Sequence, residues 1–225
     1  MDQRVVIVTG AHGVLGRAVV QAVQARGWAV AAIDHGAPKA DLGDAFEVGG
    51  VDLTNAVAAA RAVQSVVDRF GRLDAVLNIA GGFAWQKVDD AEPAWDRMFA
   101  LNLTTALNTS RSALPHLKAV SDGRIVNIGS AASLKAGAGM GAYAASKSAV
   151  HRLTESLAEE LKDTGVTVNA VLPSIIDTPA NRADMPEVDP GKWVAPGDLA
   201  EVVLFLASPK ARAITGALVP VTGKV

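Results

Sequence analysis

The chain has 225 residues, of which 50% are apolar, and its 21 basic and 23 acidic residues give a formal net charge of −2. That length allows one domain with a sizeable core, and the scattered basic residues argue against a nucleic-acid partner. The absence of cysteine excludes disulfides and thiolate metal sites, and the four histidines lack the spacing of metal ligands. We therefore expect no metal site. Because the first apolar run is too short for a signal peptide or a membrane span, we also expect a cytoplasmic protein with no membrane partner.

In the first part of the chain, short apolar runs alternate with longer stretches whose composition favours helices. The segment 34–44 contains Gly36, Pro38 and Gly43, and it is predicted to be a loop that is short for a crossover helix. Gly71 is placed to end the helix before it. The pattern predicts strands at 4–9, 28–33, 46–51 and 73–78, and helices at 14–26 and 55–70.

The second part of the chain continues the same alternation. One long helix is predicted over 91–118, with Pro115 as a kink or an end, and Gly165 closes a second long helix. This alternation predicts βαβ units in a single α/β domain, 1–225, whose doubly wound parallel sheet of about seven strands carries helices on both faces. Such sheets bind ligands at the carboxyl ends of their strands. The remaining predicted elements are strands at 123–128, 166–172 and 217–221, and helices at 140–163 and 196–207.

A glycine-rich segment, TGAHGVLG at 9–16, joins the first predicted strand to the first predicted helix. Glycine permits a tight turn and a close approach to a pyrophosphate, and the helix N-terminus favours negative charge. Glycines also simply end strands, but a strand before and a helix after are the context that a dinucleotide site requires. We therefore expect this loop to bind a dinucleotide through Gly10, His12, Gly13, Val14, Leu15 and Gly16.

Acidic residues follow the second and third predicted strands. Asp34 lies 18 residues after Gly16, where a carboxylate accepts hydrogen bonds from the adenosine ribose and repels a 2′-phosphate. This favours NAD(H), although a solvated turn aspartate is an alternative and the neighbouring His35 leaves NADP(H) open. Asp52 and Leu53 are candidates for contacts with adenine, but Asp52 fits the N-cap region of the next helix equally well.

Tyr143 precedes Lys147 by four residues, so on a helix the two side chains share one face. Moving a tyrosine pKa from about 10 to about 7 requires about 4 kcal/mol of preference for the phenolate, which a unit charge about 4 Å away supplies at an effective dielectric of about 20. The pair therefore predicts a general acid or base, and Tyr143 is the only tyrosine of the chain. By itself this spacing is common on helices, so its weight depends on the other motifs.

Together the motifs resemble the short-chain dehydrogenase/reductase family over nearly the whole chain. The resemblance implies a Rossmann-like fold and an NAD(P)-dependent oxidoreductase that transfers a hydride between a nicotinamide cofactor and a carbonyl or alcohol substrate. The segments that carry it, in family order, are TGAHGVLG, NIAG at 78–81, Asn102, Ser130, YAASK at 143–147 and PSIIDT at 173–178.

The resemblance also implies roles for individual residues. Tyr143 would exchange a proton with the substrate oxygen, Lys147 would lower the pKa of Tyr143 and bind the nicotinamide ribose, and Ser130 would hold the substrate oxygen. Asn102, inside the long helix, would position a water that links Lys147 to solvent. Further cofactor contacts are implied for Asn78, whose role would be mainly structural, and for Ala80, Gly81, Pro173, Ile176 and Thr178.

Some features depart from the common family pattern. The glycine spacing is GxxGxxG, which also occurs in extended sugar epimerases and dehydratases, but these need a large C-terminal region and only about 50 residues follow the sixth strand. Ser174 stands where a glycine is usual, and GALVPVTGKV has one glycine where two are common at the chain's end.

A closer resemblance links the segments GGFAW, GMGAY, SAVH and DTPANRADMP to the dihydropteridine reductase branch, which uses NADH and typically lacks the catalytic serine. Because Ser130 is present, we rank carbonyl or alcohol chemistry above pterin reduction. A non-enzymatic NAD-binding regulator is a third hypothesis, and the full Ser/Tyr/Lys/Asn set argues against it.

The small-molecule substrate is expected to enter beside a lid at about 174–197. Family members usually pair through their long central helices, so we expect a homotetramer or homodimer. Ordinary packing explains the apolar side chains near the entrance as well as substrate contact does; the candidates are Phe83, Trp85, Met140, Met185 and Trp193.

Overall fold

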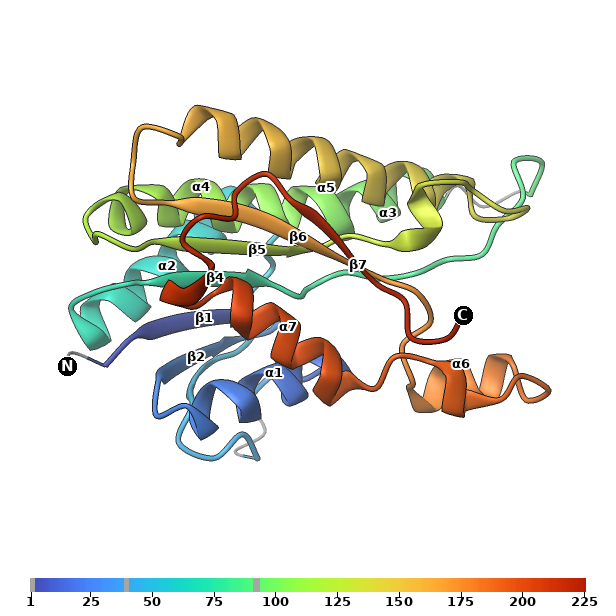
Figure 1. Ribbon diagram of the computed structural model, residues 1–225, viewed down its shortest axis with the longest axis horizontal. Coiled ribbons are helices and arrows are strands. Elements are labelled where there is room, and N and C mark those ends of the chain that lie inside the picture. The colour runs from blue at the N-terminus through green and yellow to red at the C-terminus, as the bar shows by residue number, and fades with distance from the viewer. Residues whose placement is uncertain (1–2, 39–40, 91–93) are drawn as a thin grey trace.

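A wholly parallel, seven-stranded sheet forms the centre of the computed structural model, which describes residues 3–38, 41–90 and 94–225. The strand order is β3-β2-β1-β4-β5-β6-β7, so the chain reverses its winding direction between β1 and β4 (Figure 1). The carboxyl ends of strands at such a reversal leave a crevice for a ligand. The strands are β1 (Val5–Thr9), β2 (Ala29–Ile33), β3 (Phe46–Val48), β4 (Ala75–Asn78), β5 (Arg124–Ile128), β6 (Thr167–Pro173) and β7 (Leu218–Val221).

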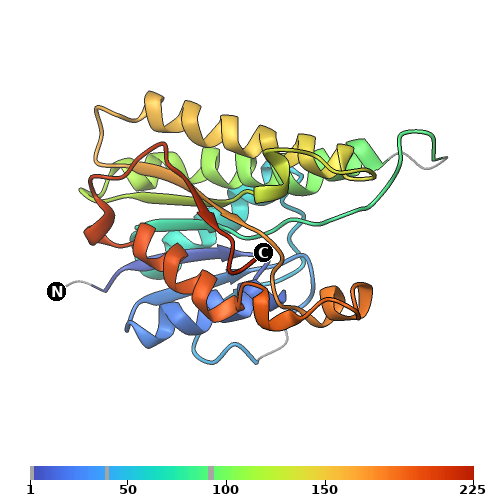
Figure 2. The same ribbon diagram turned by 45° about the vertical axis from the view of Figure 1, so that its right-hand side comes forward.

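Helices cover both faces of the sheet (Figure 2). One face carries α1 (Val14–Ala25) and α7 (Pro196–Leu206), which pack against each other. The other carries α2 (Ala56–Phe70), α4 (Thr105–Lys118) and α5 (Gly141–Glu160). These layers confirm the doubly wound α/β fold that the alternation of strands and helices predicts.

The central strand β1 is almost wholly apolar because both of its faces are buried. In β1, Val6 and Val8 enter the core under α1 and α7, while Val5 and Ile7 enter the core under α2, α4 and α5. Successive side chains of a strand point to opposite faces, so a run without polar residues is what a doubly covered strand requires. The register is set by ladders such as Val6 opposite Val30 and Val6 opposite Ala75.

The helix predicted over 91–118 differs from the structure. Residues 91–93 lie outside the described part, and the described part holds three pieces: α3 (Ala94–Phe99), a π-helical turn (Ala100–Thr104) and α4. Pro115 does not end the helix, which continues to Lys118. A π turn inserts one extra residue per turn, and such turns are frequent at functional sites.

The segment predicted as a lid contains more regular structure than the sequence indicated. It holds α6 (Pro179–Asp184) and a 3-10 turn (Pro190–Lys192), and a parallel bridge pairs Ile176 with Val194. A second 3-10 turn, Ala131–Ser133, follows β5, and a third, Pro209–Ala211, follows α7. Within the described residues, no helix combines the length and apolar character needed to cross a membrane.

Candidate active site

The glycine-rich loop leaves a cradle at the start of α1. Gly10 has φ 63°, and a Cβ there would lie 2.8 Å from the Cα of Ala80. A Cβ on Gly16 would lie 2.1 Å from the Gly10 carbonyl oxygen, so the turn closes only without side chains. Gly13 is the N-cap of α1, and no side chain of the described residues caps the helix start. Backbone N–H groups at such a start suit a pyrophosphate, so the loop fits the predicted cofactor.

Val14 and Leu15, which are also predicted to contact the cofactor, differ in the exposure of their side chains. The side chain of Val14 is 42% exposed at the first turn of α1. Leu15 is buried in the core between α1, α7 and the sheet. A ligand can therefore reach the side chain of Val14, whereas Leu15 offers it only backbone atoms.

Asp34 is held rigidly just past the carboxyl end of β2. Its Oδ2 accepts a hydrogen bond from the backbone N–H of His12 at 2.9 Å, and its Oδ1 accepts one from Gly36 at 2.9 Å. The Nε2 atom of His12 lies 3.0 Å from Oε2 of Glu47 in β3. The glycine loop, β2 and β3 are thus tied together by one chain of polar contacts, and its member Glu47 was missed because nothing in the sequence marks it.

Asp52 and Leu53 lie in a tight turn before α2. The carboxylate of Asp52 accepts hydrogen bonds from the backbone and hydroxyl of Thr54 at 2.9 and 2.6 Å, and these bonds lower the pKa of Asp52. Asn55 is the N-cap of α2. Leu53 is buried, and its carbonyl accepts from Asn108. The Asp52 side chain therefore serves the turn itself, which agrees with its alternative reading as part of the N-cap region.

Two buried polar residues support the end of β4. Thr9 Oγ1 accepts hydrogen bonds from the backbone N–H groups of Ile79 and Ala80, both at 3.1 Å. Asn78 donates to Asn127 in β5 at 2.8 Å and to Ser110 in α4 at 3.0 Å. Asn78 thus ties β4 to β5 and α4, in agreement with the structural role expected for it.

Asn102 lies in the π turn between α3 and α4 and joins the loop after β4 to α5. Its amide accepts from the N–H of Gly82 at 2.9 Å and donates to the carbonyl of Gly82 at 3.1 Å and to Ser146 Oγ at 2.9 Å. A Cβ on Gly81 would lie 2.6 Å from Asn102 Oδ1 and 3.3 Å from Lys147 Nζ. Gly81 therefore lets the asparagine and the lysine approach the same stretch of backbone.

Ser130, Tyr143 and Lys147 meet at the carboxyl end of β5. The Ser130 side chain forms a hydrogen bond with that of Tyr143, and its Oγ accepts from the N–H of Ala132 at 3.2 Å. Lys147, buried on α5, donates from Nζ to the carbonyl of Ile128 at 2.8 Å. The ring of Phe83 packs edge-on against Tyr143, with centroids 4.9 Å apart. The tertiary structure thus brings Ser130, Tyr143 and Lys147, three of the four predicted catalytic residues, to the same end of β5, and Asn102 contacts the same helix through Ser146.

The ionisation of this cluster differs from the sequence-based prediction. Burial raises the pKa of Tyr143, and the hydrogen bond with Ser130 lowers it by a smaller amount. Burial also lowers the pKa of Lys147 to about 8. The predicted lowering of the Tyr143 pKa by Lys147 is wrong for this state of the protein, because desolvation of the phenol dominates and the ammonium is held by the Ile128 carbonyl.

The cofactor contacts expected at Pro173, Ile176 and Thr178 lie at the end of β6 and at the start of the predicted lid. Pro173 is the buried last residue of β6. The carbonyl of Ile176 accepts from Asn181 Nδ2 at 2.8 Å, and Thr178 is the N-cap of α6, where its Oγ1 accepts from the N–H of Asn181 at 3.1 Å. Thr178 therefore keeps its hydroxyl proton available for a ligand.

The candidate entrance residues divide into exposed and buried ones. Phe83 and Trp85 are 53% and 57% exposed, and Trp85 packs on Gly139, where a Cβ would lie 2.2 Å from its ring. Met140 and Met185 are partly buried. Trp193 is only 6% exposed, so it belongs to the interior and not to an open wall.

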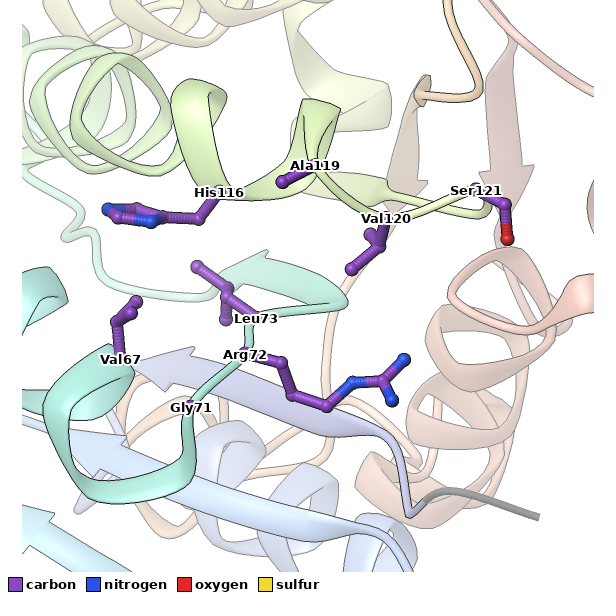
Figure 3. A pocket seen from close by; sticks show the side chains of 8 residues that line it. All are labelled: Val67, Gly71, Arg72, Leu73, His116, Ala119, Val120 and Ser121. Atoms are coloured by element: carbon purple, nitrogen blue, oxygen red, sulfur yellow. The ribbon is translucent and has the colours of Figure 1, made fainter.

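A separate cavity of about 410 Å³ lies at the amino ends of the strands, opposite the candidate active site (Figure 3). Its lining includes Arg72 and Leu73, just before β4, and Val120 and Ser121, before β5, so it lies at the amino ends of the strands. His116 of α4 also lines it. None of the predicted site residues does, and the cavity is therefore distinct from the candidate active site.

Comparisons with known proteins agree with this geometry. The family model described as short chain dehydrogenase matches residues 4–189. The 3-oxoacyl-acyl-carrier-protein reductase FabG of Vibrio cholerae is 31% identical over 99% of this chain and 97% of its own. Meso-2,3-butanediol dehydrogenase of Serratia marcescens is 32% identical over 99% and 94%. The crystal structure of carveol dehydrogenase from Mycobacterium avium in complex with NAD is similar with a TM-score of 0.87 and 28% identity, over 98% of this chain and 96% of that one.

Proposed function

We propose that this chain, which belongs to the short-chain dehydrogenase family, transfers a hydride between NAD(H) and the carbonyl or alcohol carbon of a small substrate. The single observation that carries the assignment is the convergence of Ser130, Tyr143 and Lys147 at the carboxyl end of β5. The nicotinamide cofactor supplies the hydride when bound, and the protein supplies orientation and a proton.

Tyr143 is the proton donor in the direction of reduction. Because burial raises its pKa, the phenol is protonated at neutral pH and can give its proton to the carbonyl oxygen as that oxygen becomes a hydroxyl. Ser130, hydrogen-bonded to Tyr143, holds the same oxygen from its other side. In the direction of oxidation Tyr143 must first lose its proton, so alcohol oxidation rises with pH.

Lys147 and Asn102 support the proton donor. With a pKa of about 8, the buried Lys147 is mostly protonated at pH 7, and its charge stabilises the phenolate that remains after proton transfer. Asn102 holds the backbone of Gly82 and the Ser146 hydroxyl, and Ser146 in turn donates to the carbonyl of Tyr143 at 2.8 Å. Asn102 therefore acts by positioning the catalytic helix and the loop after β4.

The cofactor preferred in this proposal is NAD(H). The cradle at Gly10, Gly13 and Gly16 suits a pyrophosphate, and Asp34 follows β2 with a carboxylate already fixed by two backbone N–H groups. A 2′-phosphate beside this carboxylate, with Glu47 behind it, would meet two negative charges. We therefore expect NADP(H) to be the weaker cofactor.

The entrance favours substrates with an apolar group beside the carbonyl. Phe83 and Trp85 remain about half exposed although both rings lie close to the catalytic helix. The hydrogen bond between Ser130 and Tyr143 favours carbonyl or alcohol chemistry over pterin reduction, and the full catalytic set favours an enzyme over a cofactor-binding regulator. A homodimer or homotetramer built on α4 and α5, and a cytoplasmic location, stay predictions.

The test measures NADH oxidation with a panel of ketones, aldehydes and quinonoid dihydropterin. Tyr143→Phe should lower kcat by a factor of about 10² to 10⁴, the usual contribution of a general acid, while NADH still binds. Ser130→Ala should also lower kcat. Ser156→Ala, an exposed position on α5, the helix that carries Tyr143, should leave kcat unchanged.

Three outcomes contradict the proposal. Turnover of the dihydropterin that is insensitive to Ser130→Ala supports pterin reduction. NADH binding without oxidation by any compound of the panel supports the regulator. Full activity of Tyr143→Phe removes the assigned proton donor.

A further inference from the structure

His151 is a buried titratable residue to which the reaction described above assigns no role. It is 2% exposed and lies on α5, one helical turn beyond Lys147 and two beyond Tyr143. Residues four apart on a helix share one face, so the phenol, the ammonium and the imidazole form a row along α5. The first two members of this row belong to the proposed catalytic site, and the third lies directly beyond them on the same helix face.

The imidazole contacts the backbone that carries the catalytic serine. Nε2 of His151 lies 3.4 Å from the backbone nitrogen of Ser130, which donates to it, and 3.2 Å from Ser133 Oγ. A Cβ on Gly129 would lie 2.5 Å from the same Nε2, so the ring packs directly on the chain between β5 and the following turn.

Together, Lys147 and His151 hold the end of β5 at two successive points. Lys147 donates to the carbonyl of Ile128, and His151 accepts from the N–H of Ser130. One helix face thus fixes both polar groups on either side of Gly129. Since Ser130 Oγ must point at Tyr143 and at the substrate oxygen, the orientation of this short stretch decides where the hydroxyl lies.

The contact also specifies the protonation state of the ring. A backbone N–H can only donate, so accepting the Ser130 N–H requires a lone pair on Nε2 and the ring proton on Nδ1. Ser133 Oγ donates its own proton to the Ser130 carbonyl at 2.6 Å, so in this tautomer it lies beside Nε2 without a hydrogen bond to it. Burial lowers the pKa of His151, and the cationic Arg152 and Lys147 lower it further, so the ring is neutral at pH 7. The other groups that contact the ring, Ser130 and Ser133, carry no charge.

We propose that His151 is a positioning residue whose neutral imidazole anchors the Ser130 N–H and thereby orients the Ser130 hydroxyl toward Tyr143. Protonation of Nε2 places two donors against each other, so acid releases the anchor. The proposal rests on the proposed function, because it assigns Ser130 and Tyr143 to the reaction.

The first experiment needs no substrate and uses the single tyrosine of the chain. The tyrosinate midpoint is measured by ultraviolet difference absorbance in the wild type, Ser130→Ala, His151→Leu and His151→Gln. Loss of the Ser130 hydrogen bond raises the Tyr143 pKa, so Ser130→Ala and His151→Leu should both move the midpoint upward. His151→Gln should leave it in place, because a glutamine oxygen reaches about as far as Nε2 and accepts the same hydrogen bond. His116→Gln, at the cavity by the amino ends of the strands, is the matched control.

The possible results separate this proposal from the proposed function. If Ser130→Ala leaves the midpoint unchanged, the pairing of Ser130 with Tyr143 is wrong, and both proposals fall. If Ser130→Ala moves the midpoint and a folded His151→Leu does not, only the role of His151 is overturned. Imidazole nitrogen NMR of the wild type covers the case in which His151→Leu fails to fold: we expect the Nδ1–H tautomer at pH 7, and an Nε2–H tautomer overturns the proposal.

The second experiment follows kcat for the carbonyl compound that is reduced fastest in the panel. As pH falls through the His151 pKa, wild-type kcat should drop by about 10- to 100-fold, the loss typical of a misplaced catalytic group, with little change in the KM for NADH. His151→Gln should keep most of the kcat measured at neutral pH and should not show this fall in kcat at acid pH. A fall in kcat that persists unchanged in His151→Gln contradicts the proposal.

Discussion

The Nζ atom of Lys147 donates a hydrogen bond of 2.8 Å to the backbone carbonyl of Ile128, the last residue of β5. The lysine of the Tyr143–Lys147 pair is therefore tied to the sheet. Because the ammonium is buried, its pKa falls to about 8, and the positive charge that the proposed mechanism uses is costly to keep in the folded protein. If Lys147 acts as proposed, its titration affects both the stability and the activity of the protein.

Lys147 should make the folded protein more stable as pH rises from about 8. The unfolded lysine titrates near 10.5 and the folded one near 8, so between these values the unfolded state binds more protons and the free energy of unfolding increases with pH. The difference corresponds to about 3 kcal/mol at most. Urea unfolding at several pH values in this window should show the rise in the wild type and its absence in Lys147→Met.

The control for this measurement is Lys162→Met, which replaces an exposed lysine just beyond α5. It should retain the full rise. Parallel curves for the wild type and Lys147→Met would mean that Lys147 titrates as it does in the unfolded chain.

Tyr143 should titrate above the ordinary tyrosine value of 10.0 in the protein without ligands, because burial of the phenol outweighs its hydrogen bond with Ser130. Ultraviolet difference absorbance reports this tyrosine alone once Tyr143→Phe is subtracted. A midpoint below 10.0 would contradict the structure and restore the activation by Lys147 that the sequence predicts.

Asp34→Asn should shift the cofactor preference toward NADP(H). The substitution removes a negative charge but keeps an oxygen for the backbone N–H of His12 or Gly36. Removal of a repulsion of about 1 to 3 kcal/mol should raise the ratio of kcat/KM for NADPH to that for NADH by about 10- to 100-fold. Asp68→Asn, on the exposed side of α2, should leave the ratio unchanged. An unchanged ratio in Asp34→Asn would mean that residues other than Asp34 set the preference between NADH and NADPH.

Gly16→Ala should destabilise the protein and weaken NADH binding, because the new methyl group would lie 2.1 Å from the Gly10 carbonyl oxygen. Overpacking of this kind typically costs about 1 to 3 kcal/mol. Gly197→Ala in the first turn of α7 meets nothing within 4 Å and should be neutral or slightly stabilising. Thermal unfolding and NADH fluorescence titration of both variants test the tightness of the loop.

Local patterns predicted much of this protein correctly. The doubly buried β1, the glycines that allow α1 to begin at Val14, and the one-turn spacing of Tyr143 and Lys147 depend only on residues close in sequence. The alternation of strands and helices in turn predicted the parallel sheet, because a helix between two strands returns the chain to the end of the sheet at which the first strand began. The π turn at Asn102 escaped prediction, because a helix with one inserted residue has nearly the same apolar pattern as a regular one.

The sequence by itself determined most of the strands and helices, the family pattern and the types of residue at the site. The tertiary structure alone decided which groups meet: Glu47 against His12, Lys147 against the Ile128 carbonyl, and His151 against the Ser130 N–H. These contacts join residues that are 35, 19 and 21 positions apart. They exist only once strand register and helix packing are set, and the same packing desolvates Tyr143 and Lys147 and fixes their pKa values.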